Sequence, residues 1–221
     1  MVMGSIAYLS LDQYKESDEA KQLVEDNIDK ISETKDYYFF DSEGNDRALI
    51  MYTGAKVEPL AYAPMCIGLN EAGIDCFILK EPFNFSLINI NKADVILKNY
   101  DYQEYYLAGH SLGGVCASMH ISNHPNEFKG LVLLASYSTK ELPSDLKVLC
   151  INGTNDEVIQ KEKFDESIVN YPTNFTNIVI EGGNHGQFGS YGKQKKDGEA
   201  SISADEQKDK VVEEIIKLVG E

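Results

Sequence analysis

The hydrophobic residues of this chain fall into short apolar runs that alternate with segments of helical periodicity. Continuous apolar runs are typical of strands buried on both faces, whereas apolar residues three and four positions apart are typical of helices. The predicted strands are residues 36–40, 47–54, 74–79, 105–109, 130–135, 147–153 and 175–181, and the helices are 60–72, 93–99, 112–123 and 161–170. This alternation predicts an α/β fold, a doubly wound and mostly parallel sheet with helices on both faces.

The two ends of the chain also have helical patterns. Residues 11–36 are polar, with apolar residues at helical spacing, and predict a surface helix. We therefore expect a polar helical lead-in over 1–35 and a single domain over 36–221. Near the other end, Ser203 and Glu206 have the spacing of a capping box that begins a final amphipathic helix. The opening five residues, MVMGS, resemble a start codon followed by a vector-derived remnant.

Composition narrows the classes of partner. Of 221 residues, 43% are hydrophobic and 25% are charged, as in a globular domain. The 36 acidic and 20 basic residues give a net charge of −16, which disfavours nucleic acid as a partner. Because no run approaches the ~18 apolar residues of a membrane span, we expect membrane association only if a native N-terminal anchor has been removed. The compartment therefore stays open between the cytoplasm and a membrane anchor.

The four cysteines do not form a ligand or disulfide pattern. Each lies within an apolar run and none is spaced with histidine as a metal ligand set, so we predict buried free thiols: Cys66, Cys76, Cys116 and Cys150. A dinucleotide fingerprint is also missing from the sequence. We therefore expect neither a metal nor a cofactor.

A serine in a strand-to-helix turn is the strongest chemical signal. The pattern Gly109-His110-Ser111-Leu112-Gly113 follows an apolar strand and precedes a helix. A serine exposed at such a turn needs flanking glycines, because side chains there would collide with the crossing chain. The N–H groups of the following helix would face developing negative charge. We predict that Ser111 is a nucleophile.

A base and an acid follow from the order of the strands. Of the four histidines, only His185 follows a late strand, within the glycine-rich segment EGGNHGQFG. The acid should follow the preceding strand, where Asp156 is the first choice, with Glu157 and then Asp145 as rivals. Such a carboxylate would hold the imidazole tautomer and stabilise the imidazolium.

The remaining site residues are expected around this triad. An oxyanion hole needs two backbone donors, for which we predict Leu112 and Ala55, with Lys56 as the alternative to Ala55. The substrate site is expected to include Phe83 and Asn84, with Lys56 and His110 beside the donors. Only residues 136–145 separate two strands at the point where a lid would be inserted, so we expect an open site without a lid domain.

At these residues the sequence resembles the α/β-hydrolase family, in its compact, lid-less branch related to dienelactone hydrolases. The resemblance covers roughly residues 36–220 and includes AGHSLGG, NGTNDEV and EGGNHGQFGSYG. It implies a Ser–His–Asp triad that maps onto Ser111, His185 and Asp156. Dienelactone hydrolases use cysteine as the nucleophile, so their substrate is not implied here.

Together these patterns predict a serine hydrolase for carboxylic esters of small or short-acyl substrates, acting through an acyl-enzyme. An acyltransferase or deacetylase acting on cell-surface carbohydrate is the alternative enzyme. A catalytically inactive binding protein on the same fold is the third class. The expected partner is a small-molecule ester.

Overall fold

The computed structural model describes residues 12–44 and 46–220. One mixed β-sheet runs through the molecule. Within those residues, eight strands are ordered β1-β2-β4-β3-β5-β6-β7-β8. β1 and β2 pair antiparallel to each other, β2 pairs antiparallel to β4, and all other pairs are parallel. The strands are β1 (Ile31–Glu33), β2 (Tyr37–Phe40), β3 (Arg47–Tyr52), β4 (Asp75–Leu79), β5 (Glu104–His110), β6 (Gly130–Leu134), β7 (Lys147–Gly153) and β8 (Thr176–Ile180).

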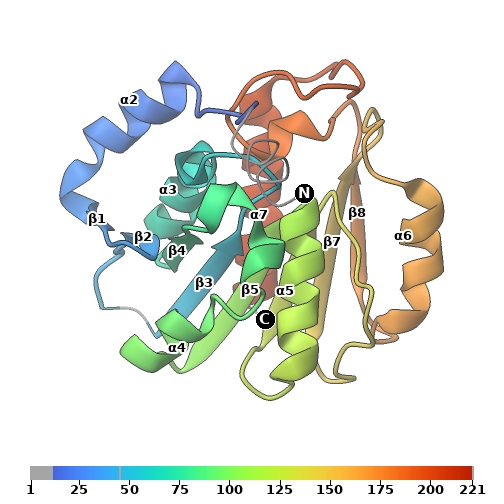
Figure 1. Ribbon diagram of the computed structural model, residues 1–221, viewed down its shortest axis with the longest axis horizontal. Helices are drawn as coiled ribbons and strands as arrows, with labels where there is room; N and C mark the ends of the chain where they lie inside the picture. Colours follow the sequence, from blue (N-terminus) through green and yellow to red (C-terminus); the bar gives the residue numbers. More distant parts are fainter. Residues whose placement is uncertain (1–11, 45, 221) are drawn as a thin grey trace, which may run out of the picture.

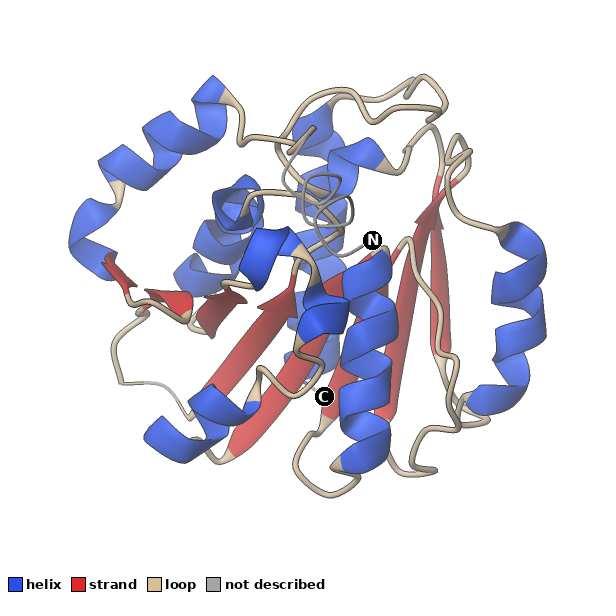
Figure 2. Cartoon of the chain, viewed as in Figure 1, coloured by secondary structure: helices blue, strands red, loops and turns tan. Residues whose placement is uncertain are grey.

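Helices cover both faces of the sheet (Figures 1 and 2). One face packs against α3 (Ala63–Glu71) and α7 (Ala204–Gly220), and α2 (Asp18–Asp26) lies outside α3. The other face packs against α4 (Asp94–Asn99), α5 (Leu112–Asn123) and α6 (Lys161–Ser167). The short 3₁₀ helices in the described residues are η1 (Ile28–Lys30), η2 (Pro59–Tyr62), η3 (Pro82–Asn84), η4 (Ser86–Ile88), η5 (Ile168–Asn170) and η6 (Gly186–Phe188). The predicted doubly wound α/β fold is confirmed.

The parallel part of the sheet sets the position of the site. β3, β5, β6, β7 and β8 all run in one direction, so their carboxyl ends meet at one edge. The loops that follow these strands therefore lie together. In open α/β sheets this edge is where ligands bind.

The N-terminal segment differs from the predicted lead-in helix. Helix α2 ends at Asp26, and Ile31–Glu33 instead pairs with β2 as an edge strand. The difference arises because the backbone groups of this polar edge find partners in the neighbouring strand. Tyr14 N–H also donates to the carbonyl of Lys56 at 2.7 Å, which joins the segment to the loop after β3. The remnant predicted at residues 1–5 lies outside the described residues.

Several local predictions are confirmed. Ser203 N–H donates to Glu206 Oε2 at 2.8 Å and Glu206 N–H to Ser203 Oγ at 3.2 Å, which makes the capping box. All four cysteines are buried free thiols. Residues 135–146, between β6 and β7, contain no helix, as expected for a protein without a lid. Among the described residues, no helix combines the length and apolarity required to cross a bilayer.

Candidate active site

Ser111 lies at a strained turn between β5 and α5. Its backbone has φ 54° and ψ −124°, a region that non-glycine residues rarely adopt and that clusters at functional sites. The turn is held by Ser111 N–H, which donates to the carbonyl of Leu134 at 3.0 Å, and by Ser136 Oγ, which donates to the Ser111 carbonyl at 2.6 Å. Bonds on both sides of the residue therefore offset the strain.

The glycines on either side of Ser111 are required by close backbone contacts. A Cβ atom at Gly109 would lie 2.5 Å from the backbone of Gly113, and one at Gly113 would lie 2.4 Å from the carbonyl oxygen of Thr53. Real Cβ atoms do not come this close to backbone atoms. The turn consequently brings the start of α5 against the end of β3, beside the loop that carries Ala55.

His185 and Asp156 form a buried pair. Nδ1 of His185 lies 2.8 Å from Oδ2 of Asp156, and their side chains are 2% and 0% exposed. Oδ1 of Asp156 accepts backbone N–H groups from Val158 at 2.8 Å and Ile159 at 2.9 Å. An ionised carboxylate only accepts hydrogen bonds, so Nδ1 is the donor and Nε2 keeps its lone pair. This is the tautomer that a general base needs.

The two rival acids do not occupy a comparable position. Glu157 and Asp145 are both exposed to solvent, whereas the Asp156 carboxylate is enclosed. The sequence alone did not exclude Glu157 or Asp145 as the acid. Like Asp156, each follows a strand whose carboxyl end lies at this edge of the sheet. The structure brings Asp156 beside His185.

Ser111 and His185 border one cavity of about 190 Å³ at the carboxyl ends of the parallel strands. Most of its other walls are apolar. The lining residues are Ser111, Leu112, Val115, Ala135, Ser136, Tyr137, Val158, Ile159, Gln160 and His185. Sequence reasoning missed the residues that follow β6 and β7. The rule that ligands bind beyond the carboxyl ends of parallel strands would have indicated them.

The structure separates the two candidates for the second oxyanion donor. Lys56 N–H donates to the carbonyl of Asn84 at 2.7 Å and is occupied. Ala55 N–H makes no hydrogen bond within residues 12–44 and 46–220. Leu112, the predicted first donor, is the first residue of α5, where backbone N–H groups have no partner in their own helix. Ala55 therefore fits the donor role better than Lys56.

Four side chains expected at the substrate site do not line this cavity: Lys56, Phe83, Asn84 and His110. Phe83 is 41% exposed. Asn84 instead fixes the loop after β3, since its carbonyl accepts from Lys56 N–H and its Nδ2 donates to Gln13 Oε1 at 3.0 Å. The cavity is instead lined by residues that follow β5, β6, β7 and β8.

His110 lies behind His185 rather than in the cavity. It is 1% exposed, and its ring centroid is 4.6 Å from that of His185. Nδ1 of His110 lies 2.8 Å from the hydroxyl of Tyr62. Burial lowers the pKa of His110 well below its usual value, and the neighbouring His185 lowers it further. A neutral ring therefore forms the wall against which His185 packs.

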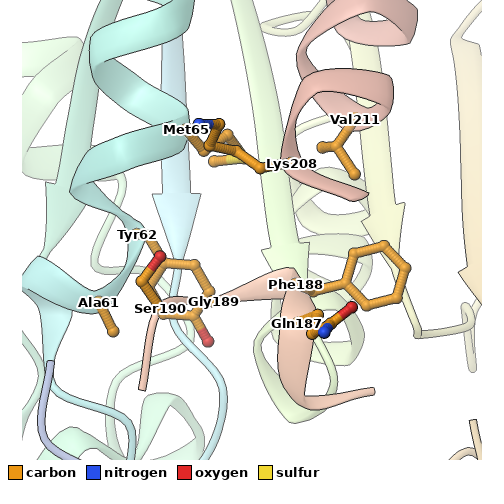
Figure 3. A pocket seen from close by; sticks show the side chains of 9 residues that line it. All are labelled: Ala61, Tyr62, Met65, Gln187, Phe188, Gly189, Ser190, Lys208 and Val211. Atoms are coloured by element: carbon orange, nitrogen blue, oxygen red, sulfur yellow. The ribbon is translucent and has the colours of Figure 1, made fainter. Parts of the chain in front are cut away.

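The segment after His185 packs against neighbouring elements, and Figure 3 shows the side chains that line a small space there. Residues 187–190 pack against η2, α3 and α7 around a space of about 10 Å³, which is room for a single water molecule. Gln187 Nε2 donates to the carbonyl of Ile202 at 3.3 Å, and Ser190 N–H to that of Ala61 at 2.7 Å. Gly186 N–H donates to Asp197 Oδ2 at 2.7 Å. These bonds fix the position of the His185 backbone.

Comparisons with known proteins agree with this architecture. Residues 48–209 match the model of the alpha/beta hydrolase family, and the chain belongs to that family. A relation to dienelactone hydrolases within the family stays a prediction. A search of curated proteins found no match.

Solved structures share the fold at low sequence identity. Est1E from Butyrivibrio proteoclasticus has a TM-score of 0.62 and 14% identity, over 86% of this chain and 98% of that one. A monoacylglycerol lipase from Paleococcus ferrophilus has a TM-score of 0.61 and 14% identity, over 84% of this chain and 100% of the lipase chain. A thermophilic esterase from Thermogutta terrifontis has a TM-score of 0.55 and 13% identity, over 83% and 87%.

Proposed function

We propose that this protein is a serine hydrolase that cleaves carboxylic esters of small or short-acyl substrates through an acyl-enzyme. One observation carries the proposal. The strained Ser111 shares a cavity with His185, whose Nδ1 is bonded to the enclosed carboxylate of Asp156. A nucleophile, a base and an orienting acid are the three parts that this chemistry requires.

In the proposed reaction, Ser111 Oγ attacks the ester carbonyl while Nε2 of His185 takes its proton. The negative charge that forms on the carbonyl oxygen is stabilised by the N–H groups of Leu112 and Ala55. The imidazolium then protonates the leaving alcohol, and Asp156 stabilises its positive charge. Water activated by the same histidine releases the acid and restores Ser111.

The size and lining of the cavity support a small acyl group. Its volume is about 190 Å³, and aliphatic side chains from α5 and the loop after β7 form much of its wall. Solved proteins with the same fold include an esterase structure with ferulic acid bound, together with the lipase and esterase named above. These similarities are consistent with ester hydrolysis. The proposal of a small acyl group is based on the volume and lining of the cavity.

Labelling with a fluorophosphonate tests the nucleophile directly. The full chain should be modified at Ser111, with the site mapped by peptide mass spectrometry. Ser136 is a matched control because it lines the same cavity and bonds to the Ser111 carbonyl. Ser136→Ala should still be labelled and Ser111→Ala should not. Lack of labelling in the folded wild type would support the inactive binding protein instead.

Substrate class is tested with p-nitrophenyl esters of increasing acyl length. We expect kcat/KM to be highest for acetate or butyrate and to fall for long chains, with no rate increase above the substrate's micelle concentration. Adding acceptor sugars separates hydrolysis from acyl transfer, because a transferase would form the sugar ester in preference to free acid. A preference for long chains would contradict the proposed substrate size.

A further inference from the structure

Three side chains converge at the end of α5 that lies away from Ser111. His120 lies in the last turn of α5 and His124 is the residue that caps its C-terminal end, and their rings stack with centroids 4.3 Å apart. Asp94, the first residue of α4, lies beside them, with Oδ1 3.9 Å from Nε2 of His120 and 3.7 Å from Nε2 of His124. In Figure 1, α4 lies toward the same end of the molecule as the end of α5 that is remote from Ser111. One nitrogen from each imidazole and one carboxylate oxygen thus lie close together.

These groups are buried without the partners that such groups normally have. His120 is fully enclosed, and within the described residues neither ring nitrogen makes a hydrogen bond of good geometry, although the Ile90 carbonyl lies close enough to act on the ring as a backbone acceptor. Oδ1 of Asp94 is likewise buried and makes no hydrogen bond there. Buried polar atoms are usually paired, and an unpaired group in a native structure indicates a missing water, ion or functional role. Here two unpaired groups point at each other.

The surroundings orient the ring nitrogens as metal ligands. Nδ1 of His124 lies 3.3 Å from Oε2 of Glu127, which leaves Nε2 facing Asp94. Metal-bound histidines commonly have a carboxylate beside their other ring nitrogen, as Glu127 lies beside Nδ1 of His124. Lys98 approaches the other oxygen of Asp94, Oδ2, at 3.7 Å and leaves Oδ1 available.

We propose that Asp94, His120 and His124 bind a divalent transition-metal ion, best fitted by Zn²⁺ with water as the fourth ligand. Two nitrogens and one oxygen suit Zn²⁺ and its neighbours in the first transition row better than Mg²⁺ or Ca²⁺, which prefer oxygen. The three ligand atoms lie within 4.8 Å of one another. Tetrahedral zinc holds such atoms about 3.3 Å apart, so small side-chain rotations complete the site.

The ion would link α4 to α5 and would not take part in the proposed ester chemistry. His120 is nine residues beyond Ser111, about 13 Å along the helix at 1.5 Å per residue. Sequence reasoning expected no metal because no residues along the chain have the spacing of a metal ligand set. Only the packing of α4 on α5 brings the carboxylate to them.

Titration calorimetry with Zn²⁺ on the chelator-treated full chain tests the proposal. We expect one equivalent bound at micromolar or tighter affinity, and X-ray absorption should show nitrogen and oxygen ligands at about 2.0 Å with imidazole scattering. Asp94→Asn and His124→Gln should each weaken binding at least about 100-fold, more than loss of an outer partner costs. Glu127→Gln should weaken it by about tenfold.

His124→Gln is the decisive variant because its side chain is 24% exposed and its loss leaves the core intact. His185→Gln serves as the matched control and should still bind one equivalent, since His185 shares a cavity with Ser111, at the other end of α5. Binding that is unchanged in His124→Gln but lost in His185→Gln would overturn the proposal. So would the absence of a zinc-dependent heat in the folded wild type.

Discussion

The hydroxyl of Tyr62 lies 2.8 Å from Nδ1 of His110 and accepts the backbone N–H of Gly54 at 2.9 Å. The phenol proton is therefore available to the lone pair of Nδ1, which burial keeps unprotonated by lowering the pKa of His110. Gly54 directly precedes Ala55, the proposed oxyanion donor, and His110 packs against His185. One buried hydroxyl thus connects the donor loop to the ring behind the proposed base.

Tyr62→Phe should reduce kcat about tenfold, a barrier increase of about 1.4 kcal/mol, with KM nearly unchanged. Removing the hydroxyl leaves Gly54 N–H and His110 Nδ1 without their partner, so the donor loop loses its fixed position. The same variant should lower the free energy of unfolding by about 1–3 kcal/mol, as loss of a buried hydrogen-bond partner does. Steady-state kinetics and urea unfolding measure the two effects.

Tyr191→Phe is the control for this experiment. Tyr191 is also buried, and its hydroxyl has no hydrogen-bond partner within the described residues. Its ring packs 5.3 Å from that of Tyr14, so the residue holds the loop through its ring. Kinetics and stability should stay close to wild type. Equal losses in the two variants would show that the Tyr62 hydroxyl has no special role.

Asp156→Asn should lower turnover on the order of 10⁴-fold while the circular dichroism spectrum stays unchanged. An amide can donate to Nδ1 of His185, which favours the tautomer that lacks a basic Nε2. Glu157→Gln and Asp145→Asn are matched controls, because both side chains are exposed and should tolerate the change. Full activity in Asp156→Asn together with an inactive control variant would reassign the acid.

Ser111→Ala and His185→Ala should each lower turnover by about 10⁶-fold, and the double variant should lose little more. This non-additivity is expected because the base has no proton to take once the nucleophile is gone. The measurement is kcat on p-nitrophenyl acetate for all four proteins. Losses that multiply would show that the two residues act independently.

Glu81 should make stability depend on pH. It is 6% exposed, and neither carboxylate oxygen has a hydrogen-bond partner in the described part of the chain. Burial raises the pKa of Glu81 to about 7 from its usual 4.5, with Lys92 acting in the opposite direction. The folded state therefore holds this proton more tightly than the unfolded state. Its contribution to stability is complete below pH 4.5 and is lost as the pH rises through about 7.

Glu81→Gln removes this contribution while keeping the shape of the side chain. Between pH 4.5 and pH 8, the wild type should lose up to roughly 3 kcal/mol of unfolding free energy relative to the variant, at 1.36 kcal/mol for each pKa unit. Urea unfolding of both proteins across this range gives the difference directly. Parallel pH profiles would mean that Glu81 is ionised at the same pH in both states.

The sequence by itself determined the elements and the strained turn. Apolar runs and helical periodicity located the strands and helices, because burial on one or two faces constrains residue type locally. The glycines around Ser111 also indicated the turn from the sequence alone, because the backbone there leaves no space for a Cβ atom. His185 was identified as the candidate base from its place after a late strand.

The tertiary structure decided which groups meet. Asp156 was one of three candidate acids until the pairing of β7 with β8 placed it 2.8 Å from His185. Lys56 stayed an alternative to Ala55 until the structure showed that its N–H donates to the carbonyl of Asn84, from a distant loop. The edge strand β1 and the approach of Asp94 to His120 could likewise not be predicted from the sequence. Local patterns encode the environment of each residue, whereas neighbours across the sheet depend on strand order and helix packing, which no short segment specifies.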